Sequence, residues 1–161
     1  SLLIVISQTR DNIGFGARFN PKTRSGGRAL RFYATLELWT SIKSHLKTTY
    51  KGKPREQGII CKVDVKKNRI TGKERSIELP IYHSTGIDDV GSCVDYLVEE
   101  KHWREKRGII TAEEFNVSLS REDLIQKVQT ENLEVELRAT VAKVWQEIEE
   151  AVSVQRKSRY S

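Results

Sequence analysis

Methionine is absent from all 161 residues, and the chain begins with Ser1 directly before an apolar run. We therefore expect a processed product or a piece of a longer one. The longest apolar run, Leu2 to Ile6, is too short to cross a membrane and lacks the basic flank of a secretory signal. Only two cysteines occur, Cys61 and Cys93, without C-x-x-C spacing, so we expect reduced thiols in a cytoplasmic protein.

Common enzyme motifs are missing as well. No G-x-x-x-x-G-K-[ST] loop is present to wrap phosphates, and Gly14-x-Gly16 opens a basic loop rather than a helix. The three histidines, His45, His83 and His102, are too far apart for metal-ligand spacing, so no metal site is expected. The sequence therefore predicts no catalytic activity for this chain alone.

The net charge of +6 is unevenly distributed. Residues 1–53 contain ten basic and two acidic residues, whereas the remainder is slightly acidic. A local basic stretch attracts polyanions, and the acidic second half argues against a chain that simply coats nucleic acid.

The clearest binding signal is the segment 14–28, which holds four glycines and no acid. Its basic side chains can neutralise phosphates, and glycine amides can approach a nucleic-acid backbone closely. Phe15 and Phe19 offer rings for unstacked bases, which favours single strands. A solvated charged loop with both rings packed on the body stays open as an alternative. The basic residues in and just after this loop are Arg18, Lys22, Arg24, Arg28 and Arg31.

Hydrophobic patterning predicts an α/β chain. The expected elements are a buried strand at 1–7, a helix at 28–34, a strand at 35–39, a basic hairpin at 41–57 with its tip near 51–54, and strands at 58–66 and 76–83 joined by a turn at 71–72.

The second half is expected to be helical. A helix is predicted at 88–101, with Val90, Cys93, Val94, Leu97 and Val98 on its buried side, and a charged, exposed link at 103–107. Capping-box spacings at 111–114 and 120–123 predict helix starts. The apolar stripe beyond residue 120 indicates one helix or two packed on the body, with a coiled-coil partner helix as the alternative because the stripe breaks at 130–132.

A family resemblance rests on residue order. Leu3 to Arg10, Ile13-Gly14, Asn20-Pro21 and the run Gly26-Gly27-x-Ala29-Leu30-x-Phe32-Tyr33-Ala34 resemble RecA-type recombinases around their second DNA-binding loop, and the likeness continues through Val65 to Ile70 and Ile81 to Ile87. It covers roughly Leu2 to Lys101. It implies the carboxyl-terminal portion of a P-loop ATPase core, a twisted mixed sheet with helices, at 1–102 with the DNA-binding loop at 14–28, followed by a mostly helical lobe at 103–161.

The resemblance also implies residue roles. Gln8 would sense the terminal phosphate of ATP, and Lys67 and Arg69 would reach the ATP of a neighbouring subunit. From the residues alone, Gln8 is a plain polar strand end. Lys67 and Arg69 are equally well explained as a solvated strand end near a turn. The expected DNA-binding residues are Arg10, Gly14, Arg18, Lys22, Arg24, Ser25, Gly26, Gly27 and Arg28.

This chain departs from the family pattern in two ways. The loop is one residue longer and more basic, and Arg69 stands where lysine is typical, which changes the geometry of phosphate contact. The family's phosphate loop, catalytic glutamate and magnesium-binding aspartate would precede Ser1. ATP and Mg²⁺ are therefore expected only together with that preceding part, and self-association is expected from the unpaired strand edges.

The implied function is homologous recombination and DNA repair by a DNA-dependent ATPase that forms filaments on single-stranded DNA. Single-stranded DNA and like subunits would be the partners. A non-catalytic DNA-binding or filament-modulating module is the alternative, and a fragment of a hexameric helicase is a third reading. The Gly-Gly-x-Ala-Leu-x-Phe-Tyr-Ala run favours the recombinase.

Overall fold

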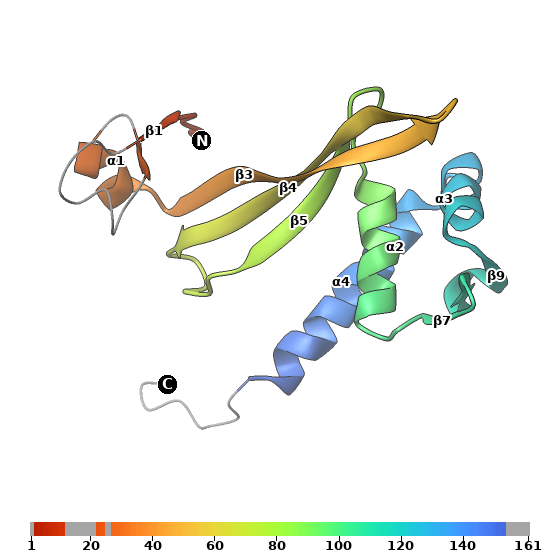
Figure 1. The fold of residues 1–161 in the computed structure, drawn as a ribbon. Coiled ribbons are helices and arrows are strands. Elements are labelled where there is room, and N and C mark those ends of the chain that lie inside the picture. Colours follow the sequence, from red (N-terminus) through yellow and green to blue (C-terminus); the bar gives the residue numbers. More distant parts are fainter. Residues whose placement is uncertain (1, 12–21, 25–26, 154–161) are drawn as a thin grey trace. The chain divides into compact units, whose positions relative to one another are not determined.

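The computed structural model describes residues 2–11, 22–24 and 27–153. Within these ranges the chain is a mixed α/β protein (Figure 1). Its elements are β1 (Thr9–Asp11), β2 (Lys22–Arg24), α1 (Gly27–Tyr33), β3 (Leu36–Tyr50), β4 (Lys53–Asn68), β5 (Ser76–Tyr82), β6 (Gly86–Ile87), α2 (Asp89–Glu99), β7 (Arg104–Lys106), β8 (Ile109–Ala112), the 3₁₀ turn η2 (Glu113–Phe115), β9 (Val117–Ser120), α3 (Arg121–Thr130) and α4 (Glu134–Ala151).

The strands form three sheets, with orders β1-β2, β3-β4-β5-β6 and β7-β8-β9. The pairs β1–β2, β5–β6, β7–β8 and β8–β9 are antiparallel, in contrast to the expected mixed sheet. Contacts divide the chain into two units, residues 1–41 with 62–77 and residues 42–61 with 78–161. No helix among the described residues is long and apolar enough to cross a membrane.

The expected hairpin between β3 and β4 is present. Its tip is Lys51-Gly52, where both residues have positive φ values of 51° and 71°. Such a two-residue turn matches the twist of the flanking strands, and glycine adopts positive φ without steric cost. Both strands are longer than the sequence pattern indicates, because exposed polar residues continue the ladder beyond the apolar stretches.

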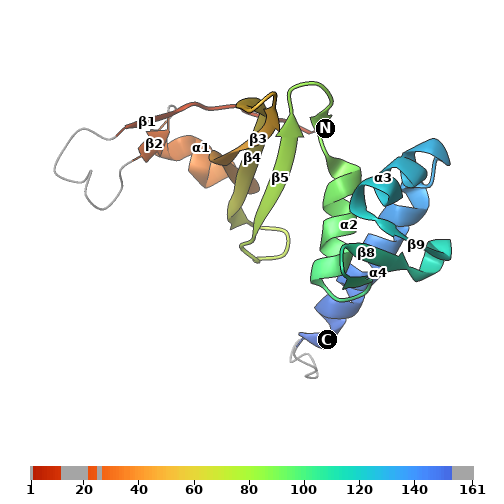
Figure 2. The same cartoon turned by 45° about the vertical axis from the view of Figure 1, so that its right-hand side comes forward.

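The hydrophobic core lies within residues 88–152, which we call the helical body (Figure 2). The predicted helix at 88–101 is observed as α2, whose Val90, Val94 and Leu97 are buried. The apolar stripe beyond residue 120 forms two helices, α3 and α4, separated where the stripe breaks. Their Leu124, Val128, Leu137 and Val144 pack into the chain's own core, which favours packing on the body over a coiled-coil partner.

Two expectations for the helical body are wrong. The link at 103–107 is not exposed throughout, because Trp103 is 1% exposed and its indole Nε1 donates a 2.7 Å hydrogen bond to Glu114 Oε2. The capping-box spacing at 111–114 starts no α-helix, because Thr111 lies in β8 opposite Ser118 of β9. Strand pairing outweighs the local capping preference there. The second capping box is confirmed, since Ser120 Oγ accepts a hydrogen bond from the Asp123 amide.

The expected buried strand at 1–7 is also wrong. Residues 2–8 belong to no helix or strand, and the side chains of Leu2 to Ile6 are all more than half exposed. A strand needs a neighbour for its backbone groups, and residues 2–6 belong to none of the sheets that the described residues form.

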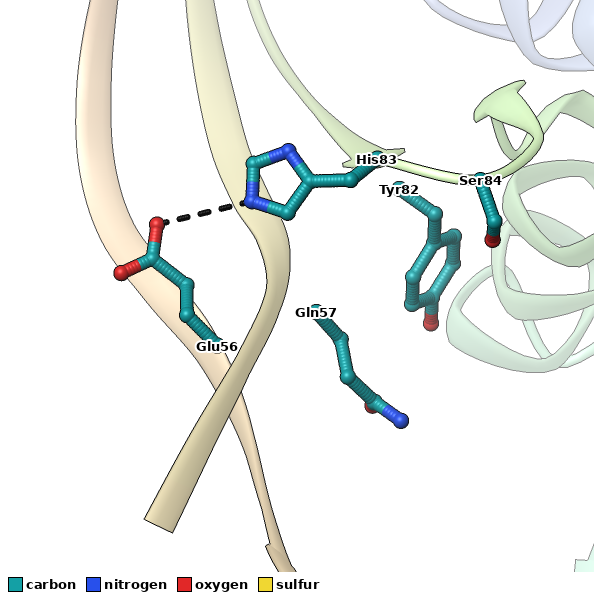
Figure 3. Close-up of a pocket in the computed structure, with 5 residues that line it drawn as sticks. All are labelled: Glu56, Gln57, Tyr82, His83 and Ser84. Carbon is teal, nitrogen blue, oxygen red and sulfur yellow. Dashed lines mark ion pairs between the residues drawn. The ribbon is translucent and has the colours of Figure 1, made fainter.

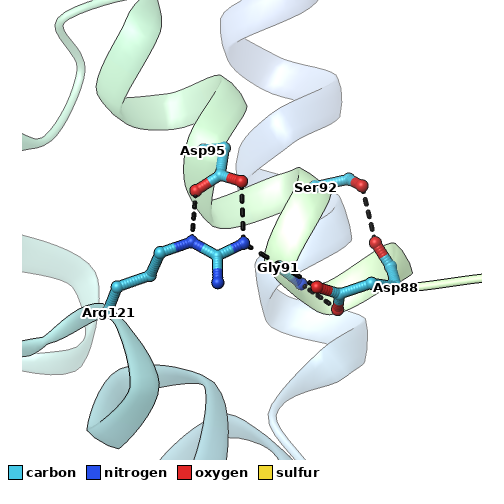
Figure 4. Close-up of polar contacts among 5 residues, drawn as sticks. All are labelled: Asp88, Gly91, Ser92, Asp95 and Arg121. Carbon is cyan, nitrogen blue, oxygen red and sulfur yellow. Dashed lines mark hydrogen bonds and ion pairs between the residues drawn. The ribbon is translucent and has the colours of Figure 1, made fainter. Parts of the chain in front are cut away.

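A polar network joins α2 and α3 inside the helical body (Figure 4). The Arg121 guanidinium donates two hydrogen bonds to the Asp95 carboxylate, at 2.6 and 2.8 Å, and lies 3.7 Å from Asp88. The Asp95 hydrogen bonds are the main reason why the pKa of Arg121 is raised above its ordinary value. Asp88 caps α2 by accepting a hydrogen bond from the Gly91 amide. Arg121, the first residue of α3, therefore lies close to the residue that caps α2.

Candidate functional site

A two-stranded sheet closes the base of the predicted DNA-binding loop. In β1 and β2, Thr9 pairs with Arg24, Arg10 with Thr23 and Asp11 with Lys22. The pairing therefore brings the backbone of three expected cationic positions, Arg10, Lys22 and Arg24, onto one ribbon. Four other expected DNA-binding residues lie outside the described residues, namely Gly14, Arg18, Ser25 and Gly26.

Three further site residues lie next to this ribbon in the chain. Gly27 and Arg28 form the first turn of α1, as the sequence predicts. Gln8 is exposed and directly precedes β1, so it lies at the entrance to the loop rather than at the end of a strand. The loop segment is therefore bounded by Gln8 and β1 on one side and by α1 on the other.

Lys67 contacts the carboxyl-terminal end of α1. Its ammonium group donates hydrogen bonds to the carbonyl oxygens of Arg31 and Phe32, the latter at 3.1 Å. The last carbonyls of a helix have no intrahelical donors, and a cation there also interacts favourably with the helix dipole. Lys67 therefore caps the helix that follows the predicted DNA-binding loop.

Arg69 contacts the same helix end. Its guanidinium lies 5.8 Å from the centre of the Phe32 ring, within range of a cation–π interaction, and its amide donates to the Thr35 carbonyl at 2.9 Å. The Asn68 side chain holds the intervening turn by accepting from the Ile70 and Thr71 amides. Lys67 and Arg69 thus both contact the end of α1, although they are more than 30 residues away from it in the sequence.

Phe32 and Asn68 are site residues that the sequence reasoning did not assign. Phe32 stands in the Gly-Gly-x-Ala-Leu-x-Phe-Tyr-Ala run, which predicts no contact for it, yet the residue is 67% exposed and its ring lies beside Arg69. The signal for Asn68 is its residue type, since asparagine side chains commonly hydrogen-bond to the backbone of turns.

Glu37 ties α1 to β3. It is 8% exposed, and its carboxylate accepts a 2.9 Å hydrogen bond from Trp39 Nε1 and lies 3.5 Å from Arg31 Nε. A buried carboxylate is stable only when it is paired and hydrogen-bonded. The charge of Arg31 is therefore engaged within the protein, at the helix end that Lys67 also contacts.

A separate shallow pocket of about 300 Å³ is lined by Glu56, Gln57, Tyr82, His83 and Ser84 (Figure 3). Glu56 Oε1 lies 3.6 Å from His83 Nε2 and 3.0 Å from His45 Nδ1. The hydrogen bond from His45 is the main cause that lowers the pKa of Glu56. Among the described residues no group of three or more His, Cys, Asp or Glu side chains is suited to hold a metal ion.

Comparison with known proteins places the chain in a family. Residues 1–88 match the family model for the RecA N-terminal domain. The chain is 32% identical over 145 residues to Protein RecA of Arthrospira platensis, covering 87% of this chain and 38% of that protein. It is 36% identical over 107 residues to Protein RecA of Chlamydia trachomatis serovar D, covering 65% of this chain and 28% of that protein.

These matches correct one expectation. The chain was assigned to the carboxyl-terminal part of the family fold, but residues 1–88 match the model for the N-terminal domain. The chain also spans less than two fifths of the length of the curated relatives it matches. Because a family model covers more than half of its residues, the chain belongs to the RecA family.

Proposed function

We propose that this chain is part of a RecA-type recombinase that acts in homologous recombination and DNA repair in the cytoplasm. It binds single-stranded DNA through the basic, glycine-rich loop 14–28 and works in a filament of like subunits. The observation that carries the proposal is the contact of Lys67 and Arg69 with α1, because α1 directly follows that loop.

In this proposal, the loop supplies positive charge and close-approaching backbone amides. Arg10, Lys22 and Arg24 share the ribbon at its base, and Arg28 follows in the first turn of α1. The remaining proposed loop contacts are Gly14, Arg18, Ser25, Gly26 and Gly27. Contacts of this kind fix a nucleic-acid backbone without reading its sequence.

Nucleotide coupling is the second part of the proposal. When ATP is bound, it supplies a terminal phosphate whose negative charge Lys67 and Arg69 of an adjacent subunit would hold, and Gln8 would sense its presence beside the loop. Lys67 and Arg69 fit this task chemically, since ammonium and guanidinium groups are common phosphate ligands. Mg²⁺ and ATP are proposed only together with a part that carries a phosphate loop, because no G-x-x-x-x-G-K-[ST] motif occurs among the 161 residues. The proposal also includes a domain boundary between residues 102 and 103, which separates a partial ATPase core (1–102) from a mostly helical lobe (103–161).

The replacement of Arg24 and Arg28 by alanine tests the loop assignment. Fluorescence anisotropy of a labelled single strand, measured over a range of salt concentrations, should show weaker binding. The log–log salt slope should be flatter by about 1.4, since each lost phosphate contact on a single strand contributes roughly 0.7. An unchanged slope would show that the loop is not the DNA site.

A further inference from the structure

The outer half of the β3–β4 hairpin is strongly basic. Residues 43–55 contain five cations and no acid. Four of them, Lys47, Lys51, Lys53 and Arg55, have no carboxylate within 4.0 Å among the described residues, whereas Lys43 is paired with Glu78 at 2.5 Å. The next acid along β4, Glu56, is engaged by His45 and His83. The positive charge of the ribbon is therefore largely uncompensated by the chain itself.

This basic ribbon is exposed on both faces. Every residue from 43 to 55 is exposed except Leu46, which is half-buried. An isolated two-stranded hairpin is only marginally stable in water, and residues 43–55 contribute no buried side chain that would stabilise this one. A long, exposed and cationic ribbon is more consistent with a binding surface than with a structural role.

The cations lie on both faces of the ribbon. Side chains alternate along a strand, so Lys43, His45 and Lys47 share one face of β3. The contact of His45 with Glu56 places Glu56 on that same face. Lys53 and Arg55, each an odd number of residues from Glu56, therefore lie on the opposite face. A ligand that meets both faces must present negative charge on two sides.

We propose that this basic ribbon, residues 43–55, binds the phosphate backbones of duplex DNA as an arm separate from the 14–28 loop. The major groove is wide enough to admit a two-stranded ribbon and has a phosphate backbone along each side. At about 3.3 Å per residue, the eight residues from Lys43 to Tyr50 extend roughly 26 Å, or about eight base pairs at roughly 3.4 Å per base pair.

Duplex DNA fits better than single-stranded DNA. Surfaces for single strands combine positive charge with several aromatic rings on which bases stack. The ribbon has one ring, Tyr50, and Lys51 Nζ already lies 5.5 Å from its centre. The ribbon can therefore supply phosphate contacts but not a row of stacking platforms.

The test uses the full 161-residue chain and a fluorescein-labelled 20-base-pair duplex, with anisotropy measured across a range of salt concentrations. The variant Lys47→Gln/Lys53→Gln removes one cation from each strand. The log–log salt slope should fall by about 1.8, because each phosphate contact on B-DNA contributes roughly 0.9. Lys47→Arg/Lys53→Arg should retain the slope, and circular dichroism should show that both variants fold.

The matched control is Lys127→Gln/Lys143→Gln, which makes the same change in net charge on α3 and α4. Each of these lysines is paired with the glutamate four residues further along the chain. Equal effects of the two glutamine pairs would overturn the proposal by showing a general charge effect. Competition by polyglutamate as strong as that by unlabelled duplex would overturn it in favour of an acidic protein partner.

The two DNA proposals fail separately. Arg24→Ala/Arg28→Ala tests the loop on single strands, and the hairpin pair tests the ribbon on duplex. If only the loop pair changes its slope, the loop proposal stands and the ribbon proposal is wrong. If only the Lys47→Gln/Lys53→Gln variant changes its slope, the ribbon proposal stands and the loop proposal is wrong.

Discussion

The helical body and the preceding extended region, α1 with β3 to β6 (residues 27–87), differ in how they are stabilised. Among the residues whose burial the structure describes, all ten buried apolar side chains lie in the helical body. In the extended region the buried residues are Glu37 and Gly58, while Leu36, Leu38 and Ile42 of β3 are exposed. Hydrophobic burial is the dominant favourable contribution to folding. The helical body therefore carries most of the stability of the described chain.

The same boundary separates the two regions in sequence comparison. The family model ends at Asp88, where the helical body begins. The candidate functional residues Gln8, Lys67 and Arg69 lie before this boundary, and the well-packed core lies after it. The family-specific residues are thus found where packing is weakest, and their positions depend on hydrogen bonds and charge contacts rather than on a core.

The largest expected effect tests the difference in burial. Leu97→Ala removes a side chain that is fully buried in α2, and it should lower the free energy of unfolding by about 2–5 kcal/mol. Leu38→Ala removes the same side chain from a site that is 52% exposed in β3, and it should cost less than about 1 kcal/mol. Urea unfolding followed by circular dichroism measures both. Similar losses would contradict the contrast between the regions.

A smaller effect is expected within the polar network of the helical body. Arg121→Gln breaks the two-hydrogen-bond contact with Asp95, and it should lower the free energy of unfolding by about 2 kcal/mol because the partner carboxylate loses its charge-assisted bonds. Arg138→Gln is the matched control, since it removes an exposed ion pair with Asp89, and an exposed pair of this kind contributes little to stability. Thermal unfolding would rank them, and a larger loss for Arg138→Gln would refute the assignment.

The smallest effect concerns the extended region. Lys67→Met removes the cation from the end of α1 and should destabilise this helix by about 0.3–1 kcal/mol. Hydrogen exchange of the α1 amides should become faster, while that of α2 stays unchanged. Lys66→Met is the control, because Lys66 pairs with Asp64 at 3.8 Å. If both variants leave α1 exchange unaltered, Lys67 does not hold the helix.

The environment of Trp103 explains why the prediction of an exposed link at 103–107 is wrong. Trp103 stands among charged residues, so the local composition indicated an exposed link, but Phe115 lies against its ring at a centroid distance of 5.8 Å and Glu114 accepts its N–H. Burial by itself raises the pKa of Glu114. The hydrogen bonds from Trp103 and His102 have a larger combined effect in the opposite direction, so the pKa lies below its usual value. Neither partner is within ten residues of Trp103, so no local pattern could reveal them.

The sequence by itself determined α1, α2, the helical character of the segment after residue 120, the Lys51-Gly52 turn and the basic character of the loop and hairpin. Helical periodicity, caps and turn residues act over a few positions and can be read directly. Only the tertiary structure decided that Lys67 and Arg69 contact the end of α1, that β1 and β2 close the loop, and that Leu2 to Ile6 are exposed. These outcomes depend on which distant segment supplies a partner, and that is a property of the folded chain.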